Sequence, residues 1–192
     1  MKIFRASYST LAAWARGDYD LAIGMYYRTT KFDTEAMRRG REYHDQWDKE
    51  IKATGRLPEI FGGKQLPEKH NAEIFARKMI TPWLEVRGKL DLKAGDVGYD
   101  WKSGVTPSTQ WAQSYQHKVY KVLYPHLKRF EYHAFNPVAR KDRAVSVSIV
   151  HLTPKSLEEG VEWLVTHASE MKHYIEQNGI EEKMAAKGIY RK

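Results

Sequence analysis

Apolar residues recur at three- and four-residue intervals in several stretches of the chain, a pattern that predicts helices. Ser7 or Ser9 is a candidate N-cap for the first of them. Thr106-Pro107 and Thr153-Pro154 each supply a capping residue followed by a proline that suits the first helical turn. The predicted helices run from Ser7 to Gly17, from about Thr34 to Ala53, from Glu68 to Met79, from Thr106 to about Tyr124 and from Thr153 to Gly179. The basic tail from Glu181 to Lys192 shows no packing pattern and is expected to fray.

Strict alternation of apolar and polar residues predicts strands in three places. Two of them, from Leu127 to Phe135 and from Ala144 to Leu152, extend a sheet. The third forms a hairpin if Gly95-Asp96 is its two-residue turn. The positions that this hairpin would turn toward the core are Leu84, Val86, Leu90, Leu92, Tyr99 and Trp101.

The other face of this hairpin carries charge. A two-residue turn sets Asp91 directly opposite Asp100, with Cβ atoms about 5 Å apart. Because side chains alternate along a strand, Lys102 lies on the same side as Asp100. Two like charges opposite each other destabilise a sheet, so this arrangement favours a divalent cation between them. Hard oxygen ligands suit magnesium or manganese.

An aspartate pair that holds such an ion indicates phosphoryl chemistry, in which the ion polarises a phosphoryl oxygen and activates a bound water. Lys102 would orient that water or stabilise charge in the transition state. The alternative is that Lys102, Lys89 and Arg87 only neutralise the two aspartates on an exposed sheet face. Short D-x-K strings are common, so the motif alone decides neither reading.

Three further residues have two interpretations each. His44 falls on the apolar stripe of Met37, Gly40, Trp47 and Ile51, which favours a core residue, but its imidazole is also a competent ligand for the same cation. Gln116 and Tyr120 lie one helical turn apart and share a face. They would hold a phosphate, a base or the lysine, or they are ordinary polar residues at the edge of a packed face.

The composition limits the possible classes. A chain of 192 residues with 42% hydrophobic content is long enough for one domain with a real core. The absence of cysteine excludes disulfides, thiolate zinc sites and cysteine-ligated iron–sulfur clusters. Without a long apolar run or a secretory signal, we expect a cytoplasmic protein. The net charge of +8 attracts polyanions, of which nucleic acid is the foremost candidate partner.

Five short motifs occur in order along most of the chain. They are Ser7-Tyr-Ser-Thr-Leu through Tyr27 (an S-x-S segment), Gly40-Arg-Glu-Tyr-His44 (G-x-x-x-H), Gly88-Lys-Leu-Asp91 (G-x-x-D), Asp100-Trp-Lys-Ser-Gly104 (D-x-K-[ST]-G) and Gln116-His-Lys-Val-Tyr120 (Q-x-x-x-Y). Each motif alone is weak, but the set in register is specific. Together they resemble the RecB-type branch of the PD-(D/E)XK nuclease superfamily, which includes CRISPR-associated adaptation nucleases and phage and mitochondrial single-strand exonucleases.

This resemblance implies an α/β, restriction-endonuclease-like fold, in which a mixed central sheet is flanked by helices. It implies roles for seven residues: His44, Asp91, Asp100 and the carbonyl of Trp101 as metal ligands, Lys102 as the catalytic lysine, and Gln116 and Tyr120 on a helix that contacts DNA or the lysine. Many relatives carry four cysteines that bind an iron–sulfur cluster. Because this chain has none, no cluster is expected, and packing alone must join its two halves.

We therefore expect residues 1–192 to form a single magnesium- or manganese-dependent deoxyribonuclease domain. Exonuclease action on DNA ends or single strands is favoured, because single strands are held by stacking and charge, and aromatic and basic residues flank the predicted site. The aromatic candidates for this contact are Trp14, Tyr26, Tyr27, Trp111 and Tyr115. A structure-selective endonuclease and a nucleic-acid-binding module without catalysis are the alternatives.

Overall fold

The central feature of the fold is a mixed β-sheet. The computed structural model describes residues 3–30, 34–140 and 144–189. Within these ranges the sheet contains six strands: β1 (Phe4–Ser7), β2 (His70–Thr81), β3 (Leu84–Ala94), β4 (Val97–Ser103), β5 (Arg129–Phe135) and β6 (Val145–His151). Their order is β1-β3-β4-β5-β6, and β2 also pairs with β3. The pairs β1–β3 and β4–β5 are parallel, and the other pairs are antiparallel.

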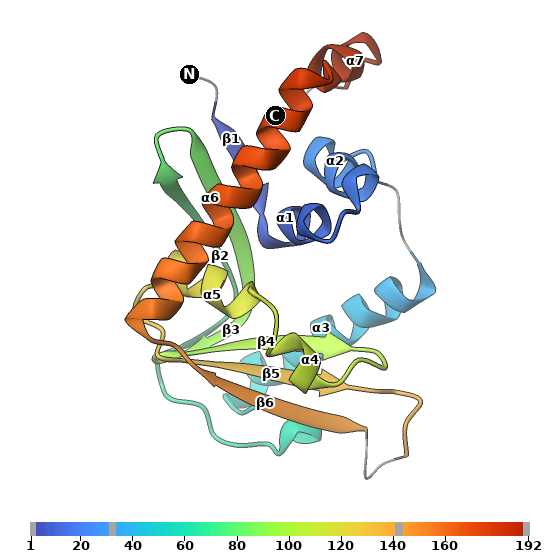
Figure 1. Ribbon diagram of the computed structural model, residues 1–192. Coiled ribbons are helices and arrows are strands. Elements are labelled where there is room, and N and C mark those ends of the chain that lie inside the picture. The colour runs from blue at the N-terminus through green and yellow to red at the C-terminus, as the bar shows by residue number, and fades with distance from the viewer. Residues whose placement is uncertain (1–2, 31–33, 141–143, 190–192) are drawn as a thin grey trace.

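Helices flank the sheet (Figure 1). They are α1 (Tyr8–Ala15), α2 (Tyr19–Tyr27), α3 (Glu35–Thr54), a 3₁₀ turn at Glu59–Phe61, α4 (Ser108–Trp111), α5 (Gln116–Leu123), α6 (Pro154–Gln177) and α7 (Ile180–Ala186). The predicted N-caps Ser7 and Thr153 each accept a hydrogen bond from a backbone N–H of the first turn, and so does Thr34 at the start of α3. The predicted fold class is confirmed. In the part of the chain described here, no helix is long and apolar enough to cross a membrane.

Two hydrophobic cores hold these layers together. The first core joins α1, α2, α5 and α6 to the sheet and includes Leu11, Leu84, Val119, Phe130 and Leu164. The second core joins α3 and the loop after it to the hairpin and includes Trp47, Ile51, Phe61, Leu92 and Trp101. The site residues are therefore held from both sides of the sheet.

The side chains of β3 change face near Asp91. Leu90 packs in the first core and Leu92 in the second, although a regular strand would place both on one face. On β2, Glu73 lies beside this point, and its φ of +53° belongs to a region that residues other than glycine rarely adopt. The six predicted apolar positions are all buried, as expected. The prediction that they share one face of the hairpin is wrong.

The turn at Gly95-Asp96 is confirmed, because Ala94 pairs with Val97 as its register requires. The pairing of β3 with β4 then ends at Leu92 and Tyr99, one step before Asp91 and Asp100. On the same edge of β3, β1 pairs only as far as Arg87. Residues 88–91 therefore lie at a fork in the sheet, between the part paired with β1 and the part paired with β4. The predicted cross-strand backbone pair of the two aspartates is replaced by this opening.

One predicted helix is a strand. The segment predicted as a helix from Glu68 to Met79 forms β2, which pairs with β3 from His70↔Ala94 to Thr81↔Leu84. Its apolar residues fit both periods, since Ala72, Ala76 and Ile80 recur every four residues, yet side chains in the strand alternate between faces. Pairing along the whole of β3 satisfies its backbone hydrogen bonds and overrides the helical pattern.

The helix predicted from Thr106 to Tyr124 is broken into α4 and α5. Thr106 does not cap it, and Pro107 occupies the N-cap position. The break follows from Ser114, whose hydroxyl donates to the carbonyl of Trp111 and accepts from the N–H of Gln116. Such a side chain offers the backbone an alternative to helical hydrogen bonds. The break rotates α5 relative to α4, and so it changes the direction in which the side chains of α5 point.

The other predicted elements agree with the structure more closely. The strands predicted from Leu127 and Ala144 are β5 and β6, and the last long helix is α6. Helix α2 was not predicted. The tail was predicted to fray, but Ile180–Ala186 forms α7, and Ile180, Met184 and Ile189 pack against the first core. The last part of this tail, 190–192, lies outside the described residues.

Gly160 on α6 provides a test of the close packing between α5 and α6. A Cβ at this position would lie 2.6 Å from the carbonyl oxygen of Lys118. Alanine favours a helix by about 1 kcal/mol over glycine. We expect Gly160→Ala to destabilise nonetheless, by about 1–3 kcal/mol, because a rigid backbone atom must move. Urea unfolding measures the change. Ser169→Ala, on an exposed position of the same helix, is the control and should leave stability equal or higher. A stabilised Gly160→Ala protein would contradict this packing.

Candidate active site

Asp100 is the centre of the candidate site. It lies on β4, and only 4% of its surface is exposed. Gln116 Nε2, from the start of α5, donates a hydrogen bond to Asp100 Oδ1 at 2.7 Å. Lys102 Nζ lies 2.7 Å from Asp100 Oδ2, so the lysine two residues along the strand forms an ion pair with it. The same-side prediction for Asp100 and Lys102 is confirmed.

The surroundings of Asp100 disfavour its charged form. Burial and the nearby charge of Asp91 together raise the pKa of this carboxyl to about 6, against the opposing effect of Lys102. Asp100 Oδ2 is buried, and its partner is the ammonium of Lys102. A single ammonium therefore leaves this pair of carboxylates incompletely neutralised.

Asp91 lies at the fork in the sheet and bridges its two sides. Its Oδ2 accepts a hydrogen bond from the backbone N–H of Trp101 at 2.8 Å, in place of a ladder partner on β3. Its Oδ1 faces Nδ1 of His44 on α3 at 3.5 Å. The side chain of Trp101 packs in the second core, so only its backbone is available to the site.

His44 is half-buried rather than part of a core, with 31% of its side chain exposed. Burial alone would lower its pKa, but the hydrogen bond and charge of Asp91 outweigh burial, so the pKa is raised above its ordinary value. The core interpretation of His44 therefore does not hold, since the ring faces a carboxylate. Helix α3 presents this ring to the site because Trp47 and Ile51, further along, anchor the helix in the second core.

Gln116 and Tyr120 share a face of α5, as predicted, and both contact the residues around the site. Gln116 is committed to Asp100 through its amide nitrogen. The Tyr120 hydroxyl donates to the backbone carbonyl of Lys89 on β3, and its ring stacks on Phe130 in the first core. Only 7% of Tyr120 is exposed, so this residue stabilises the position of β3 at the fork. The predicted contacts of these two residues with a substrate stay predictions.

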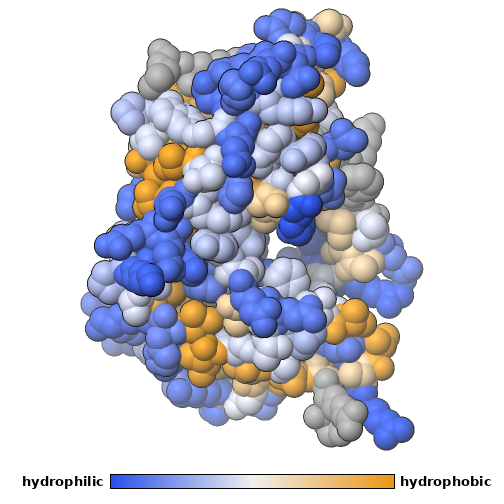
Figure 2. All heavy atoms as spheres, viewed as in Figure 1, coloured by the Kyte–Doolittle hydropathy of each residue, from blue (hydrophilic) through white to orange (hydrophobic). Residues whose placement is uncertain are grey.

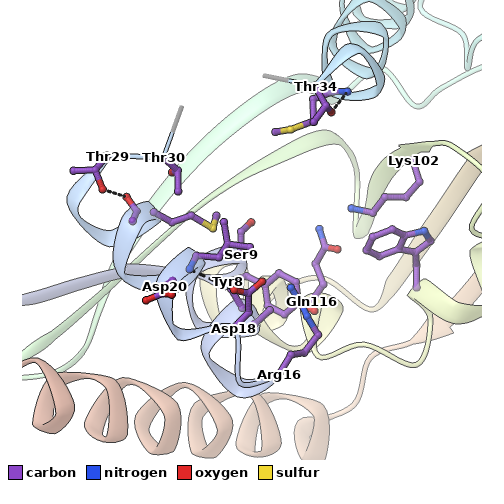
Figure 3. Close-up of a pocket in the computed structure, with 17 residues that line it drawn as sticks. Tyr8, Ser9, Arg16, Asp18, Asp20, Thr29, Thr30, Thr34, Lys102 and Gln116 are labelled. Carbon is purple, nitrogen blue, oxygen red and sulfur yellow. Dashed lines mark hydrogen bonds between the residues drawn. The ribbon is translucent and has the colours of Figure 1, made fainter. Parts of the chain in front are cut away.

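A pocket of about 950 Å³ opens beside these residues. Lys102, Gln116 and Trp111 line one end of it, and residues of α1, α2 and the start of α3 line the rest. In Figure 3 the side chains of Lys102 and Gln116 point into the space that Thr34 borders from the opposite side. Figure 2 shows the molecule hollowed at this level, between α1 and α2 on one side and the sheet with α4 on the other. The polar lining away from the site includes Ser9, Arg16, Asp18, Asp20, Thr29 and Thr30.

The sequence marked Trp111 as a candidate for contact with DNA, but it did not predict the contact of this ring with Lys102. Lys102 Nζ lies 4.4 Å from the centre of the Trp111 ring, a cation–π contact inside the pocket. In a continuous helix, Trp111 and Gln116 would point roughly 140° apart, because each residue turns the helix by about 100°. The break between α4 and α5 lets both side chains reach the same carboxylate–lysine pair. Ser114, which causes the break, was the residue from which this arrangement could have been predicted.

The residues at the fork fit a divalent cation of the magnesium type. The two aspartates and the backbone of Trp101 offer hard oxygen ligands, and His44 offers a nitrogen. The buried Asp100 carboxylate receives one amide hydrogen bond and one ammonium, and the charge of Asp91 lies nearby, so a divalent cation would balance the negative charge that remains. Among the described residues, no three His, Asp or Glu side chains converge to enclose an ion by themselves. Magnesium is commonly held by one or two carboxylates and keeps several waters, so a two-carboxylate site suits it.

Comparisons with known proteins agree with this architecture. No protein-family model matches the sequence, and no curated protein matches it. Among solved structures, an alkaline exonuclease from Laribacter hongkongensis has a TM-score of 0.58 and 12% identity, over 97% of this chain and 95% of that chain. The chain shares its fold. The same exonuclease in complex with dAMP gives a TM-score of 0.56 at 13% identity, over 96% and 94% of the two chains. A phage-related exonuclease from Haemophilus somnus gives 0.52 at 13% identity, over 88% and 82%.

The burial of Asp100 predicts a stability effect with a defined pH window. Its pKa in the folded metal-free protein is about 6, against an ordinary value of 3.8. The folded state therefore holds a proton that the unfolded state releases, so stability falls as the pH rises from about 4 to 6 and stays lower above that. We expect Asp100→Asn to raise the free energy of unfolding above pH 6 by about 1–3 kcal/mol.

Urea titrations in EDTA at pH 5 and pH 8 measure this difference. Asp96→Asn is the control, because the Asp96 side chain is 50% exposed in the hairpin turn. We expect its effect to be small and similar at both pH values. If Asp100→Asn destabilises the protein at pH 8 as much as at pH 5, the carboxylate is better neutralised than the structure indicates.

Proposed function

We propose that this protein is a divalent-metal-dependent deoxyribonuclease that hydrolyses phosphodiester bonds, with magnesium or manganese as its cofactor. The observation that supports this most directly is the buried, incompletely neutralised carboxylate of Asp100, with Asp91 nearby and with two partners, Lys102 and Gln116, that line a large pocket. The net charge of +8 favours a polyanionic substrate. The shared fold with exonucleases supports the same activity.

The roles of the residues follow from their contacts. Asp91 and Asp100, with the Trp101 carbonyl and His44, would hold the cation. When bound, a divalent ion polarises a phosphoryl oxygen and lowers the pKa of a coordinated water. Lys102 supplies a positive charge for the phosphate oxygens as negative charge builds on them, and Trp111 holds its ammonium in the pocket. Gln116 fixes the orientation of Asp100, and His44 that of Asp91.

Exonuclease action on DNA ends or single strands is our first choice of substrate class. The neighbouring structures compared above are named as exonucleases, and one of them is a complex with dAMP, a mononucleotide. We propose that the chain belongs to the RecB-type branch because of the resemblance of its five motifs. A structure-selective endonuclease is the alternative, and the substrates of the cleavage assay distinguish it from an exonuclease.

Cleavage assays test the assigned roles. End-labelled single- and double-stranded DNA and closed circles are incubated with the protein and Mg²⁺ or Mn²⁺. We expect Lys102→Ala to lower the cleavage rate by a factor of about 10²–10³, because it removes transition-state charge stabilisation. Asp100→Asn should lose at least as much. Lys128→Ala, which removes an ammonium from a side chain that is 80% exposed, is the control and should cleave normally.

The substrates also decide the mode of action. Release of mononucleotides from labelled ends, with closed circles left intact, is the expected result. Cleavage of closed circles would reject a strict exonuclease. A protein that binds DNA but cleaves none of these substrates would be a binding module, and the proposed activity would be wrong.

Metal binding can be measured without cleavage. A ligand that binds the folded state raises the thermal midpoint, and at one hundred times its Kd it adds about 2.7 kcal/mol of stability. We expect Mg²⁺ or Mn²⁺ to raise the midpoint of the unsubstituted protein and to leave that of an Asp91→Asn, Asp100→Asn double variant unchanged. Equal shifts in both proteins would place the cation elsewhere.

A further inference from the structure

A second surface, away from the pocket, combines exposed apolar and cationic side chains. It lies on the outward face of β1, β2 and β3, and we call it the outer strip. Its members are Phe75, Arg77 and Met79 of β2, Glu85, Arg87 and Lys89 of β3, and Arg5 of β1. The inward face of the same strands carries Leu84, Val86 and Leu90, which pack in the first core. These outward residues lie together because residues 70–81 form a strand that pairs with β3.

Cross-strand pairing arranges the outer strip in rows. Phe75 pairs with Lys89, Arg77 with Arg87, and Met79 with Glu85, so each row places side chains of two strands side by side. Glu85 in turn pairs with Arg5. Rows two residues apart on a strand are about 7 Å apart, so the strip extends roughly 13 Å along β3 from Lys89 to Glu85. It is therefore long enough for a short run of nucleotides.

Phe75 is unusually exposed for an aromatic residue of this chain. Its exposed fraction is 62%, against 46% for Tyr19 and 37% for Tyr115. Met79, two residues along the same face, is 44% exposed. The aromatic candidates Trp14 and Tyr27 are buried in the first core instead. A flat, exposed ring between cationic side chains is the arrangement that stacks an unpaired base and holds its phosphates.

Two of the three arginines of the outer strip are held in place by one carboxylate. Arg87 Nε donates to Glu85 Oε1 at 2.7 Å, and Arg5 Nε lies 3.5 Å from the same oxygen. The hydrogen bond from Arg87 lowers the pKa of Glu85, and the charges of Arg5 and Arg77 lower it as well, so three guanidinium groups surround this carboxylate. Three cations against one anion leave a net positive charge. Pre-organised guanidinium groups lose less entropy when they bind phosphate.

The outer strip begins beside the fork that carries the candidate site. Lys89 lies two residues before Asp91 on β3, and its ammonium forms an ion pair with Glu73 of β2, beside the point where the side chains of β3 change face. A strand bound along the strip would thus reach the fork at its Lys89 end.

We propose that the outer strip binds single-stranded nucleic acid, with a base stacked on Phe75 and phosphates held by Arg77 and the neighbouring cations. A duplex offers base faces only at its ends, so the exposed ring favours an unpaired strand. The proposal deepens the proposed function, because it names the strand that the fork would receive, but binding at the strip does not require cleavage.

Fluorescence anisotropy tests the proposal in EDTA, where no metal-dependent cleavage occurs. The probe is a labelled oligothymidine of about 20 nucleotides, long enough to cover several stacking positions. We expect Phe75→Ala to weaken binding by roughly 5- to 100-fold, and Phe75→Trp to restore it, because the stacking surface returns. Arg77→Ser should reduce the slope of log K against log salt by about 0.7, the value for one phosphate contact on a single strand.

Ile149→Ala and Lys128→Ser are the matched controls. These side chains are 53% and 80% exposed, and they lie on β6 and just before β5, away from the strip. We expect either control to change the affinity less than about twofold, within the range of ordinary surface substitutions. A blunt duplex should respond to Phe75→Ala much less than the single strand. Oligouridine is an additional arm that reports whether the strip distinguishes RNA from DNA.

Three results would overturn the proposal. The first is an affinity of Phe75→Ala and Arg77→Ser that matches the unsubstituted protein. The second is an equal loss for duplex and single strand, which would exclude base stacking. The third is a self-association, measured by light scattering, that Phe75→Ala abolishes while DNA affinity is unchanged, since the strip would then join two copies of the chain. A failure of cleavage with intact binding at the strip would count against the proposed function alone.

Discussion

The burial of one carboxylate, that of Asp100, is the constraint on which the site depends. An ionised carboxylate with 4% of its surface exposed is costly unless other groups compensate for lost water. The protein supplies one amide hydrogen bond and one ammonium, and it places a second carboxylate close by. The raised pKa is the direct consequence. A domain that only needed stability would replace this pair with apolar residues, since buried ion pairs are weak sources of stability.

The fork in the sheet explains how two aspartates approach each other without a ladder between them. Between Arg87, where pairing with β1 ends, and Leu92, where pairing with β4 begins, this edge of β3 has no partner strand among the described residues. The carboxylate of Asp91 accepts the hydrogen bond from the backbone N–H of Trp101, which a carbonyl of a paired strand would otherwise accept. The side-chain alternation of β3 changes at the same point. Local irregularity and function therefore coincide here, as is common where a strand re-aims a side chain.

The sequence was sufficient for the hairpin turn, the same-side placement of Asp100 and Lys102, and the caps of α1 and α6, because each depends on local geometry. It was not sufficient for β2, whose apolar spacing fits two periods until β3 is available as a partner. It also missed the break before Gln116, where a single serine competes with the helix backbone. His44 lies on an amphipathic stripe that predicts a core position, and only the end of α3 beyond it enters the core. For β2 and His44 a long-range partner decided between two locally acceptable structures, whereas the break before Gln116 was decided by local hydrogen bonds.

The geometry at the fork also relates the two surfaces proposed to bind substrate. The pocket adjoins the side of the sheet where α1 and α2 pack, whereas the outer strip lies on the opposite face of β1, β2 and β3. A continuous sheet would separate them. At residues 88–91 this edge of β3 has no partner strand among the described residues, but the side chain of Tyr120 packs there and donates to the carbonyl of Lys89. Asp91 lies at this point of β3, two residues beyond Lys89 of the strip and close enough to Asp100 for its charge to act on that carboxyl. A nucleic acid strand bound along the strip would therefore reach the candidate cation site at the end of the strip, without crossing the sheet.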